Sequence, residues 1–197
     1  ALELGVKWFT VYAFSTENWR RPADEVRYLM DFNESLLLRR RDELNDRDVR
    51  MRFIGRRGRP VPKRIIQRMD ESIALTEKNR TMTLTIAFNY GARGEITRAA
   101  RRLAEEVVAG RLDPADITAE RMTQALDTSG IPDPDVLIRT SGECRLSNFL
   151  LWQCAYTEFV FLDIHWPEFD RAWLEKAIDQ FRGRSRRFGG LGDGVTR

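Results

Sequence analysis

The densest group of side chains able to bind an anion lies in segment 139–148. Arg139, Arg145 and Ser147 there surround Gly142, and they offer two guanidinium groups and one hydroxyl. Guanidinium groups bind phosphate through paired, charge-assisted hydrogen bonds, so this set suits a dense anion such as diphosphate. An ordinary surface loop with ion pairs to Glu143 explains the same residues, and spacing alone slightly favours that interpretation.

One carboxylate stands in an otherwise apolar stretch. Glu158 is preceded by Ala155-Tyr156-Thr157 and followed by Phe159-Val160-Phe161. A carboxylate at the start of a strand is costly to bury without a cation. An arginine and a magnesium ion are equally good partners here, because Mg²⁺ often uses one or two protein carboxylates together with substrate phosphates.

A polar cluster follows the first predicted strand. Ser15, Asn18 and Trp19 come directly after the apolar run Val6–Ala13. Polar side chains at this place can orient a substrate, and Trp19 can form the wall of a hydrophobic slot. A capping turn that leads into Pro22, with Trp19 as a core anchor, explains one polar residue of the cluster but not all of them.

Composition excludes several classes of protein. The 197 residues are 42% hydrophobic and 32% charged, which suits one compact domain and argues against disorder. Cys144 and Cys154 are too few for a disulfide framework or a four-ligand zinc site, and a reducing, cytosolic setting is expected. The single histidine, His165, excludes chemistry that needs a histidine pair. The longest apolar run, 149–152, is far shorter than a membrane span, and no signal peptide is recognisable.

Positive charge is concentrated in segment 39–68, although the whole chain carries only +3. This segment has 12 basic and 4 acidic side chains, a local charge of +8. A solvated helix face is the first interpretation for Arg39-Arg40-Arg41. Nucleic acid and an anionic membrane surface are weaker alternatives.

Strand and helix patterns alternate along the chain, which predicts an α/β fold with a mainly parallel central sheet flanked by helices. In such sheets, ligands bind beyond the carboxyl ends of the strands, so the loops after Ala13 and Arg139 are expected to lie on one edge. We expect strands at 6–13, 49–55, 82–88, 136–138 and 159–162, a turn at 89–91, and helices at 22–44, 65–73 and 96–110. Two further helices are expected to begin after the capping residues Thr118 and Asp170, with Arg121 where the Glu of a complete capping box would stand.

Segments 13–22, 89–91, 139–143, 145–153 and 186–190 together resemble the signatures of cis-prenyltransferases. The resemblance is closest to bacterial undecaprenyl diphosphate synthase and its polyprenyl relatives, and it runs from about Leu4 to Gly190. It implies a single domain at 1–190 with a hydrophobic tunnel, followed by a flexible tail at 191–197. It also implies condensation of isopentenyl diphosphate with an allylic diphosphate such as farnesyl or geranyl diphosphate, with loss of pyrophosphate.

The resemblance also implies roles for particular residues. Arg139, Arg145, Leu146 and Ser147 match the isopentenyl diphosphate site, and Glu158 matches a ligand of Mg²⁺. Arg187 and Gly189 match a motif that reaches the partner subunit's site in a homodimer or heterodimer. The remaining matches lie in the substrate loop, where Asn18 is the proposed proton acceptor: Ser15, Thr16, Glu17, Asn18, Trp19 and Arg21.

An apolar channel is needed for the growing isoprenoid, and the helix after Pro22 is a candidate to line it, although core packing explains the same stripe. The stripe consists of Val26, Leu29, Met30, Phe32, Leu36 and Leu37. A cytoplasmic enzyme for the cell-wall lipid carrier, with peripheral contact to the inner face of the plasma membrane through its apolar product, is the expected setting.

One family motif is missing. The pattern His-x-x-x-Asp-Gly-Asn-x-Arg-Trp, which supplies a magnesium-binding aspartate and a diphosphate cradle, occurs nowhere in the sequence. We expect it upstream of Ala1, because Leu2, Leu4 and Gly5 read as the end of a helix, and we expect a chain that begins at Ala1 to be inactive. The alternatives are a non-catalytic subunit of such an enzyme and a nucleic-acid-binding domain built on the basic segment 39–68. That segment lacks the interleaved aromatic residues typical of nucleic-acid-binding domains.

Overall fold

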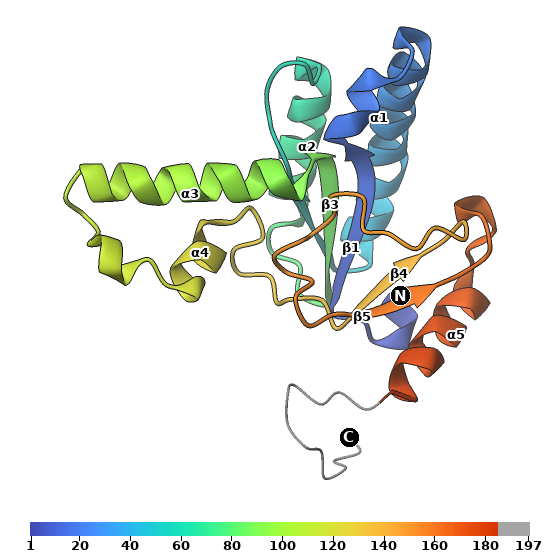
Figure 1. Cartoon of the computed structure of the whole chain (residues 1–197). Coiled ribbons are helices and arrows are strands. Elements are labelled where there is room, and N and C mark those ends of the chain that lie inside the picture. Colours follow the sequence, from blue (N-terminus) through green and yellow to red (C-terminus); the bar gives the residue numbers. More distant parts are fainter. Residues whose placement is uncertain (185–197) are drawn as a thin grey trace. The chain divides into compact units, whose positions relative to one another are not determined.

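The computed structural model describes residues 1–184, and the chain divides into two compact units (Figure 1). One unit spans Leu2–Pro132 and the other begins at Asp133. All strand pairs in both units are parallel, as the alternation of strand and helix patterns predicted. The strands form two sheets, one of three strands and one of two, where the sequence had predicted one central sheet.

The larger unit is built on the sheet β1-β3-β2, with β1 at Trp8–Ser15, β2 at Val49–Ile54 and β3 at Met82–Tyr90. The central strand, β3, is the most buried of the three. The apolar first strand is less buried than its composition suggests. β1 is an edge strand of this sheet, only Phe14 in it is buried, and Trp8 is 44% exposed. An apolar run does not reveal how many neighbours its strand will have.

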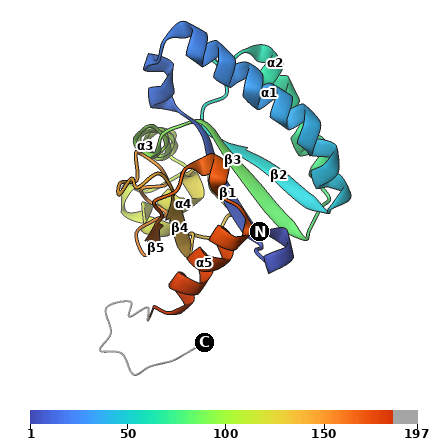
Figure 2. The ribbon, with the colours of Figure 1, turned by 90° about the vertical axis from the view of Figure 1, so that its right-hand side faces the viewer.

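Helices α1 (Ala23–Asp46) and α2 (Lys63–Thr76) pack against each other and against β2 (Figure 2). Pro22 and Pro62 stand immediately before their first residues, where a missing N–H costs nothing. The apolar stripe of α1 divides in two. Met30 and Leu37 are buried, and Val26 and Leu29 pack against the same core, but Phe32 and Leu36 are exposed. Core packing therefore accounts for four of the six residues. The buried members of this core are Phe14, Met30, Leu37, Met51, Val61, Ile65, Met69 and Phe88.

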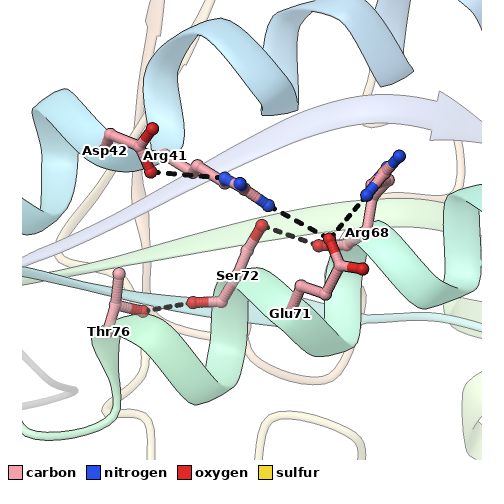
Figure 3. Close-up of polar contacts among 6 residues, drawn as sticks. All are labelled: Arg41, Asp42, Arg68, Glu71, Ser72 and Thr76. Carbon is pink, nitrogen blue, oxygen red and sulfur yellow. Dashed lines mark hydrogen bonds and ion pairs between the residues drawn. The ribbon is translucent and has the colours of Figure 1, made fainter.

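A polar network also joins α1 to α2 (Figure 3). Arg41 Nη1 on α1 lies 3.1 Å from Glu71 Oε2 on α2, and Arg68 Nη1 lies 2.8 Å from the same oxygen. The hydrogen bond from Arg68 is the main reason that the pKa of the Glu71 carboxyl lies below its ordinary value. Further along α2, Ser72 Oγ donates to the carbonyl of Arg68 at 2.7 Å, and Thr76 Oγ1 donates to the carbonyl of Ser72 at 2.8 Å.

After β3 the chain forms α3 (Ala92–Val108), a short 3-10 turn at Pro114–Asp116 and α4 (Ala119–Ala125). The Thr118 side chain caps α4 by accepting from the backbone N–H of Arg121, as the sequence predicted. The predicted turn at 89–91 was wrong in its extent. Asn89 and Tyr90 are the last residues of β3, and only Gly91 separates this strand from α3, which begins at Ala92.

The smaller unit contains β4 (Val136–Arg139), β5 (Glu158–Phe161) and α5 (Arg171–Arg182). Asp170 caps α5 by accepting from the N–H of Trp173 at 3.1 Å, which confirms the predicted cap. Val160, Leu162 and Ala177 are buried together between β5 and α5. Among the helices of residues 1–184, none combines the length and apolar character needed to cross a membrane.

Candidate active site

The turn after β1 is ordered by its own polar groups. The chain leaves β1 at Ser15 and enters a 3-10 turn at Thr16–Arg20. Asn18 Oδ1 accepts from the backbone N–H of Ser15 at 2.8 Å, and the Asn18 carbonyl accepts from the N–H of Arg21 at 3.1 Å. Arg21 then pairs with Glu25 in α1. Ser15 is thus the N-cap of this turn, and the Asn18 side chain contributes to the cap by accepting from the N–H of Ser15. The proposed part of Asn18 in proton transfer remains a prediction. Thr16 and Glu17 bond to each other at the surface of the turn.

Trp19 connects this turn to the ends of the other two strands. Its ring packs edge-on against Phe14, with 4.9 Å between the ring centres. Its Nε1–H donates to Asn89 Oδ1 at 2.8 Å, and Asn89 Nδ2 donates to the carbonyl of Arg56 at 2.9 Å. Trp19 is therefore the core anchor that the sequence offered as one alternative. A wall facing substrate would have to use the part of the ring that remains accessible, since this side chain is only partly buried.

A second buried network at this edge was not predicted from the sequence. Glu95, on the first turn of α3, is fully buried and accepts from Tyr90 Oη–H at 2.6 Å and from the backbone N–H of Asp127 at 2.9 Å. Asp127 in turn accepts from Arg98 at 2.6 Å and from the N–H of Gly55 at 3.3 Å. An acidic residue in the first turn of a helix ordinarily signals a favourable charge near the positive end of the helix. Nothing in the sequence pointed to its partners.

A pocket opens near the carboxyl end of β2. It is lined by segment 55–57 and by apolar residues of β2, β3, α2 and the loop before α2. The lining residues are Phe53, Ile54, Gly55, Arg56, Arg57, Val61, Ile66, Met69 and Phe88. With about 10 Å³ of free space, this cavity has room for no more than a single water molecule.

Segment 139–148 follows β4 in the smaller unit and has an unusual backbone. The N–H of Ser141 donates to the carbonyl of Ile164 at 2.6 Å, and the N–H of Gly142 donates to that of Leu162 at 3.1 Å. Both residues have positive φ angles, 69° and 64°. A backbone held in this region at a non-glycine residue is strained and frequently marks a binding loop. Ser147, Asn148 and Leu150 share this property.

The predicted anion-binding side chains lie along this segment. Arg139 is the last residue of β4, and Arg145 is exposed and forms an ion pair with Glu143. Leu146 is half-buried and Ser147 is exposed. The ion pair is the one that the surface-loop interpretation expected, and it leaves the guanidinium accessible. Arg139, Arg145 and Ser147 belong to the smaller unit, and the turn 15–19 belongs to the larger one.

Glu158, the first residue of β5, has an arginine partner. Its Oε2 lies 2.9 Å from Nη1 of Arg184, which also donates to the carbonyl of Phe159 at 2.7 Å. The described residues contain no cluster of three or more histidine, cysteine or acidic side chains arranged to hold a metal. In this part of the chain, Glu158 offers a single carboxylate, which fits Mg²⁺ only when substrate phosphates complete the ligand set. Arg187 and Gly189 lie outside the described residues.

Six of the twelve basic residues at 39–68 form ion pairs. Five of the seven partner carboxylates lie outside that window, four of them on α1 and α2. The pairs are Arg40 with Glu43, Arg41 with Asp42 and Glu71, Arg47 with Glu3, Arg57 with Asp70, Arg64 with Asp31 and Glu34, and Arg68 with Glu71. This pairing engages half of the cations and so weakens the nucleic-acid alternative, which needs cations free to contact phosphates.

Parallel α/β units with arginine- and serine-bearing loops after their strands are typical of enzymes that bind phosphorylated substrates. The family model described as putative undecaprenyl diphosphate synthase matches residues 1–189. The chain belongs to this family, the cis-prenyltransferases.

Individual relatives agree with this assignment. The chain is 52% identical to trans,polycis-polyprenyl diphosphate synthase ((2Z,6E)-farnesyl diphosphate specific) of Thermobifida fusca, over 96% of this chain and 67% of that protein. It is 51% identical to isoprenyl transferase of Brucella abortus, over 95% of this chain and 73% of that protein. Lavandulyl diphosphate synthase from Lavandula x intermedia, solved with dimethylallyl diphosphate, superposes with a TM-score of 0.92 at 38% identity, covering 95% of this chain and 80% of the other.

Proposed function

We propose that the protein condenses isopentenyl diphosphate with an allylic diphosphate to give a cis-polyprenyl diphosphate and pyrophosphate. The observation that supports this most directly is the family match over residues 1–189, which includes both candidate loops. The relatives are named as polyprenyl and isoprenyl transferases. A non-catalytic subunit is the second candidate, but Arg139, Arg145 and Ser147 are all retained here.

In this proposal Arg139, Arg145 and Ser147 hold the diphosphate of isopentenyl diphosphate. Guanidinium groups match the geometry of phosphate oxygens, and the exposed Arg145 exchanges Glu143 for the substrate. The backbone bonds from Ser141 and Gly142 to the chain after β5 fix the start of the loop before substrate arrives. Such preorganisation lowers the entropy cost of binding.

The turn after β1 is proposed to handle the other reacting group. Asn18 would orient the isopentenyl group for loss of its proton, with Ser15 and a diphosphate oxygen as candidate acceptors. Thr16, Glu17, Trp19 and Arg21 would contact substrate from the same turn. The bond from Ser15 N–H to Asn18 Oδ1 supports a fixed orientation of the amide. An amide is a weak base, so its role here is to position.

Glu158 is proposed to hold Mg²⁺ together with diphosphate oxygens. The bound ion supplies positive charge to the departing pyrophosphate. Arg184 keeps the Glu158 carboxylate neutralised in the protein alone, and its bond to the carbonyl of Phe159 allows it to stay near this site when the carboxylate changes partner.

The wider setting is also a proposal. We propose a homodimer in which Arg187 and Gly189 reach the partner subunit's site, and a cytoplasmic protein that contacts the inner face of the plasma membrane through its long apolar product. The product would serve as a lipid carrier for the cell wall. Light scattering after size-exclusion chromatography measures the assembly, and separation of labelled products by length identifies the chain made.

Steady-state kinetics of Arg139→Ala and Arg145→Ala test the proposed function. Each charged hydrogen bond contributes roughly 1.5–3 kcal/mol, so we expect the Michaelis constant for isopentenyl diphosphate to rise about 10- to 150-fold in each variant. Arg111→Ala is a matched control, because Arg111 is also exposed and paired with an exposed glutamate, Glu106. Unchanged constants in both loop variants, or an equal change in the control, would remove these arginines from the site.

A pair of substitutions at Asn18 separates capping from catalysis. Asn18→Asp keeps an oxygen that can accept from Ser15 N–H, whereas Asn18→Ala removes it. If the amide orients substrate, both variants lose turnover by more than about 10-fold while the Michaelis constants change little. Normal turnover in Asn18→Asp would leave Asn18 a capping role only.

A further inference from the structure

Asn89 stands where the pairing of the three-stranded sheet becomes irregular. On the β1 side, Phe14 pairs with Phe88 and Ser15 pairs with Tyr90, so the register passes over Asn89. On the β2 side, regular pairing ends at Ile54 and Ala87. Such irregularities commonly turn a side chain toward a functional site.

The side chain of Asn89 joins the segments on both sides of β3. Its Oδ1 accepts from Trp19 Nε1–H at 2.8 Å, and its Nδ2 donates to the carbonyl of Arg56 at 2.9 Å. Its backbone carbonyl accepts from the N–H of Arg56 at 3.2 Å. Asn89 is 3% exposed, so these bonds are shielded from water, and losing a partner there costs more than at the surface.

Asparagine suits this position for three reasons together. The φ angle of Asn89 is 49°, a left-handed conformation that asparagine tolerates better than most residues. One planar amide offers an acceptor to Trp19 and a donor to Arg56. Aspartate lacks the donor, and glycine tolerates the backbone but lacks both groups. Gly55, next to Arg56, makes the approach possible, because a Cβ there would lie 2.1 Å from the carbonyl oxygen of Phe88.

Fixing the indole also fixes the turn that carries it. Trp19 is held on one side by Phe14 and on its polar edge by Asn89. The preceding residue is Asn18, whose Oδ1 bonds to the start of the same turn. The Trp19 ring and the Asn18 amide therefore hold the turn 15–19 from two sides, one against β3 and one against the end of β1.

We propose that Asn89 is a positioning residue, which orients Trp19 and with it the turn 15–19 for the allylic and isopentenyl substrates. It also ties that turn to the backbone of Arg56, just after β2. This inference rests on the proposed function, since it assigns a role within the same reaction.

Kinetics of single and double variants test the coupling. Asn89→Gly removes the amide without straining the backbone, and Trp19→Phe removes the indole N–H while keeping a ring beside Phe14. A single neutral hydrogen bond is worth about 2- to 13-fold. We expect each variant to lower kcat/KM for the allylic substrate by about that factor. The double variant should be no worse than the more affected single variant, because both remove the same bond.

Asn79→Gly is the matched control. Asn79 precedes the other end of β3 and its Nδ2 donates to the carbonyl of Val49 at 3.0 Å and to Asn45 Oδ1 at 3.2 Å. If Asn89 acted only through stability, two variants with the same loss of melting temperature would lose the same amount of kcat/KM. Asn79→Gly would then lower kcat/KM as much as Asn89→Gly does. We expect Asn79→Gly to lower the melting temperature and to leave kcat/KM unchanged.

A readout independent of activity follows Trp19 directly. In protein labelled with 5-fluorotryptophan, the ¹⁹F resonance missing from Trp19→Phe belongs to Trp19. We expect Asn89→Gly to shift that resonance and Asn79→Gly to leave it in place. An unmoved resonance in Asn89→Gly, or kinetic losses that multiply in the double variant, would overturn the inference. A different outcome is a Trp19 resonance that shifts in Asn89→Gly although the protein shows no prenyl transfer. That result would confirm the contact between the two side chains. It would overturn the proposed function and, with it, the catalytic purpose assigned to Asn89.

Discussion

Replacing Thr76 with valine removes one hydroxyl from the contact between α2 and β2 and leaves the side-chain volume almost unchanged. Thr76 is fully buried at the last residue of α2. Its Oγ1 accepts from the backbone N–H of Met51 at 2.9 Å and donates to the carbonyl of Ser72 at 2.8 Å. Met51 is also buried, so valine leaves its N–H without this partner in an apolar environment.

The expected cost follows from these contacts. An unsatisfied buried donor costs about 1–3 kcal/mol, and the Ser72 carbonyl keeps its place in the helix, so Thr76→Val should lower the unfolding free energy by roughly that amount. Thr76→Ser keeps the hydroxyl and removes one methyl group, which costs about 0.5–1.5 kcal/mol. The two substitutions thus separate the hydrogen bond from the packing.

Urea denaturation followed by circular dichroism measures both variants. With a slope near 2 kcal/mol per molar urea, Thr76→Val should lower the midpoint by about 0.5–1.5 M. Hydrogen exchange gives the sharper result. After correction for global stability, the Met51 amide should exchange faster in Thr76→Val than in the wild-type protein, and at the wild-type rate in Thr76→Ser. A Met51 amide equally protected in both variants would refute the reasoning.

Two further predictions concern the loops at the two ends of the sheet. Gly55→Ala should destabilise the protein by roughly 3 kcal/mol or more, because the new Cβ would lie 2.1 Å from the Phe88 carbonyl oxygen at a φ of 116°. Gly58→Ala, with no atom within 4 Å of its Cβ, is the control, and equal melting temperatures would contradict the structure. At the opposite end, the hydrogen bond from Thr81 is the main cause that lowers the pKa of Asp48. The carboxylate therefore adds stability at neutral pH that is lost as the pH falls through its folded-state pKa. Asp48→Asn should be less stable than wild type at pH 7, with a difference that shrinks in acid, and a difference that grows on acidification would rule this out.

The sequence was a good guide where the signal is local. Alternating apolar residues located β2 and β3, and the caps at Thr118 and Asp170 marked the starts of α4 and α5 correctly. Each of these signals depends on residues a few positions apart, which contact one another in any fold that contains the element.

The failures concern long-range contacts. The apolar composition of the first strand does not reveal its burial, because burial depends on how many strands lie beside it. The positive charge at 39–68 was overestimated, because carboxylates such as Glu34 and Glu71 lie outside that window and are brought in by the packing of α1 on α2. A window of sequence counts charges without their spatial neighbours.

The candidate site shows the same division. The polar loops after β1 and β4 were identified from residue type, and the capping role of Asn18 was among the alternatives. The partner of Glu158 was left open between arginine and a metal, and Arg184 lies 26 residues away. The link from Trp19 to Asn89 spans 70 residues, so spacing gave no signal for it.

Leu150, at the end of the strained loop, limits which sequences can occupy this segment. Its φ angle is 45° and its side chain is 4% exposed. Glycine would relax the backbone but leave a cavity, and valine or isoleucine would fill the space but resist this conformation. Ser147 and Asn148 share the backbone and are less buried. In a saturation library, positions 147 and 148 should therefore accept glycine and asparagine, whereas position 150 should tolerate very few residues besides leucine.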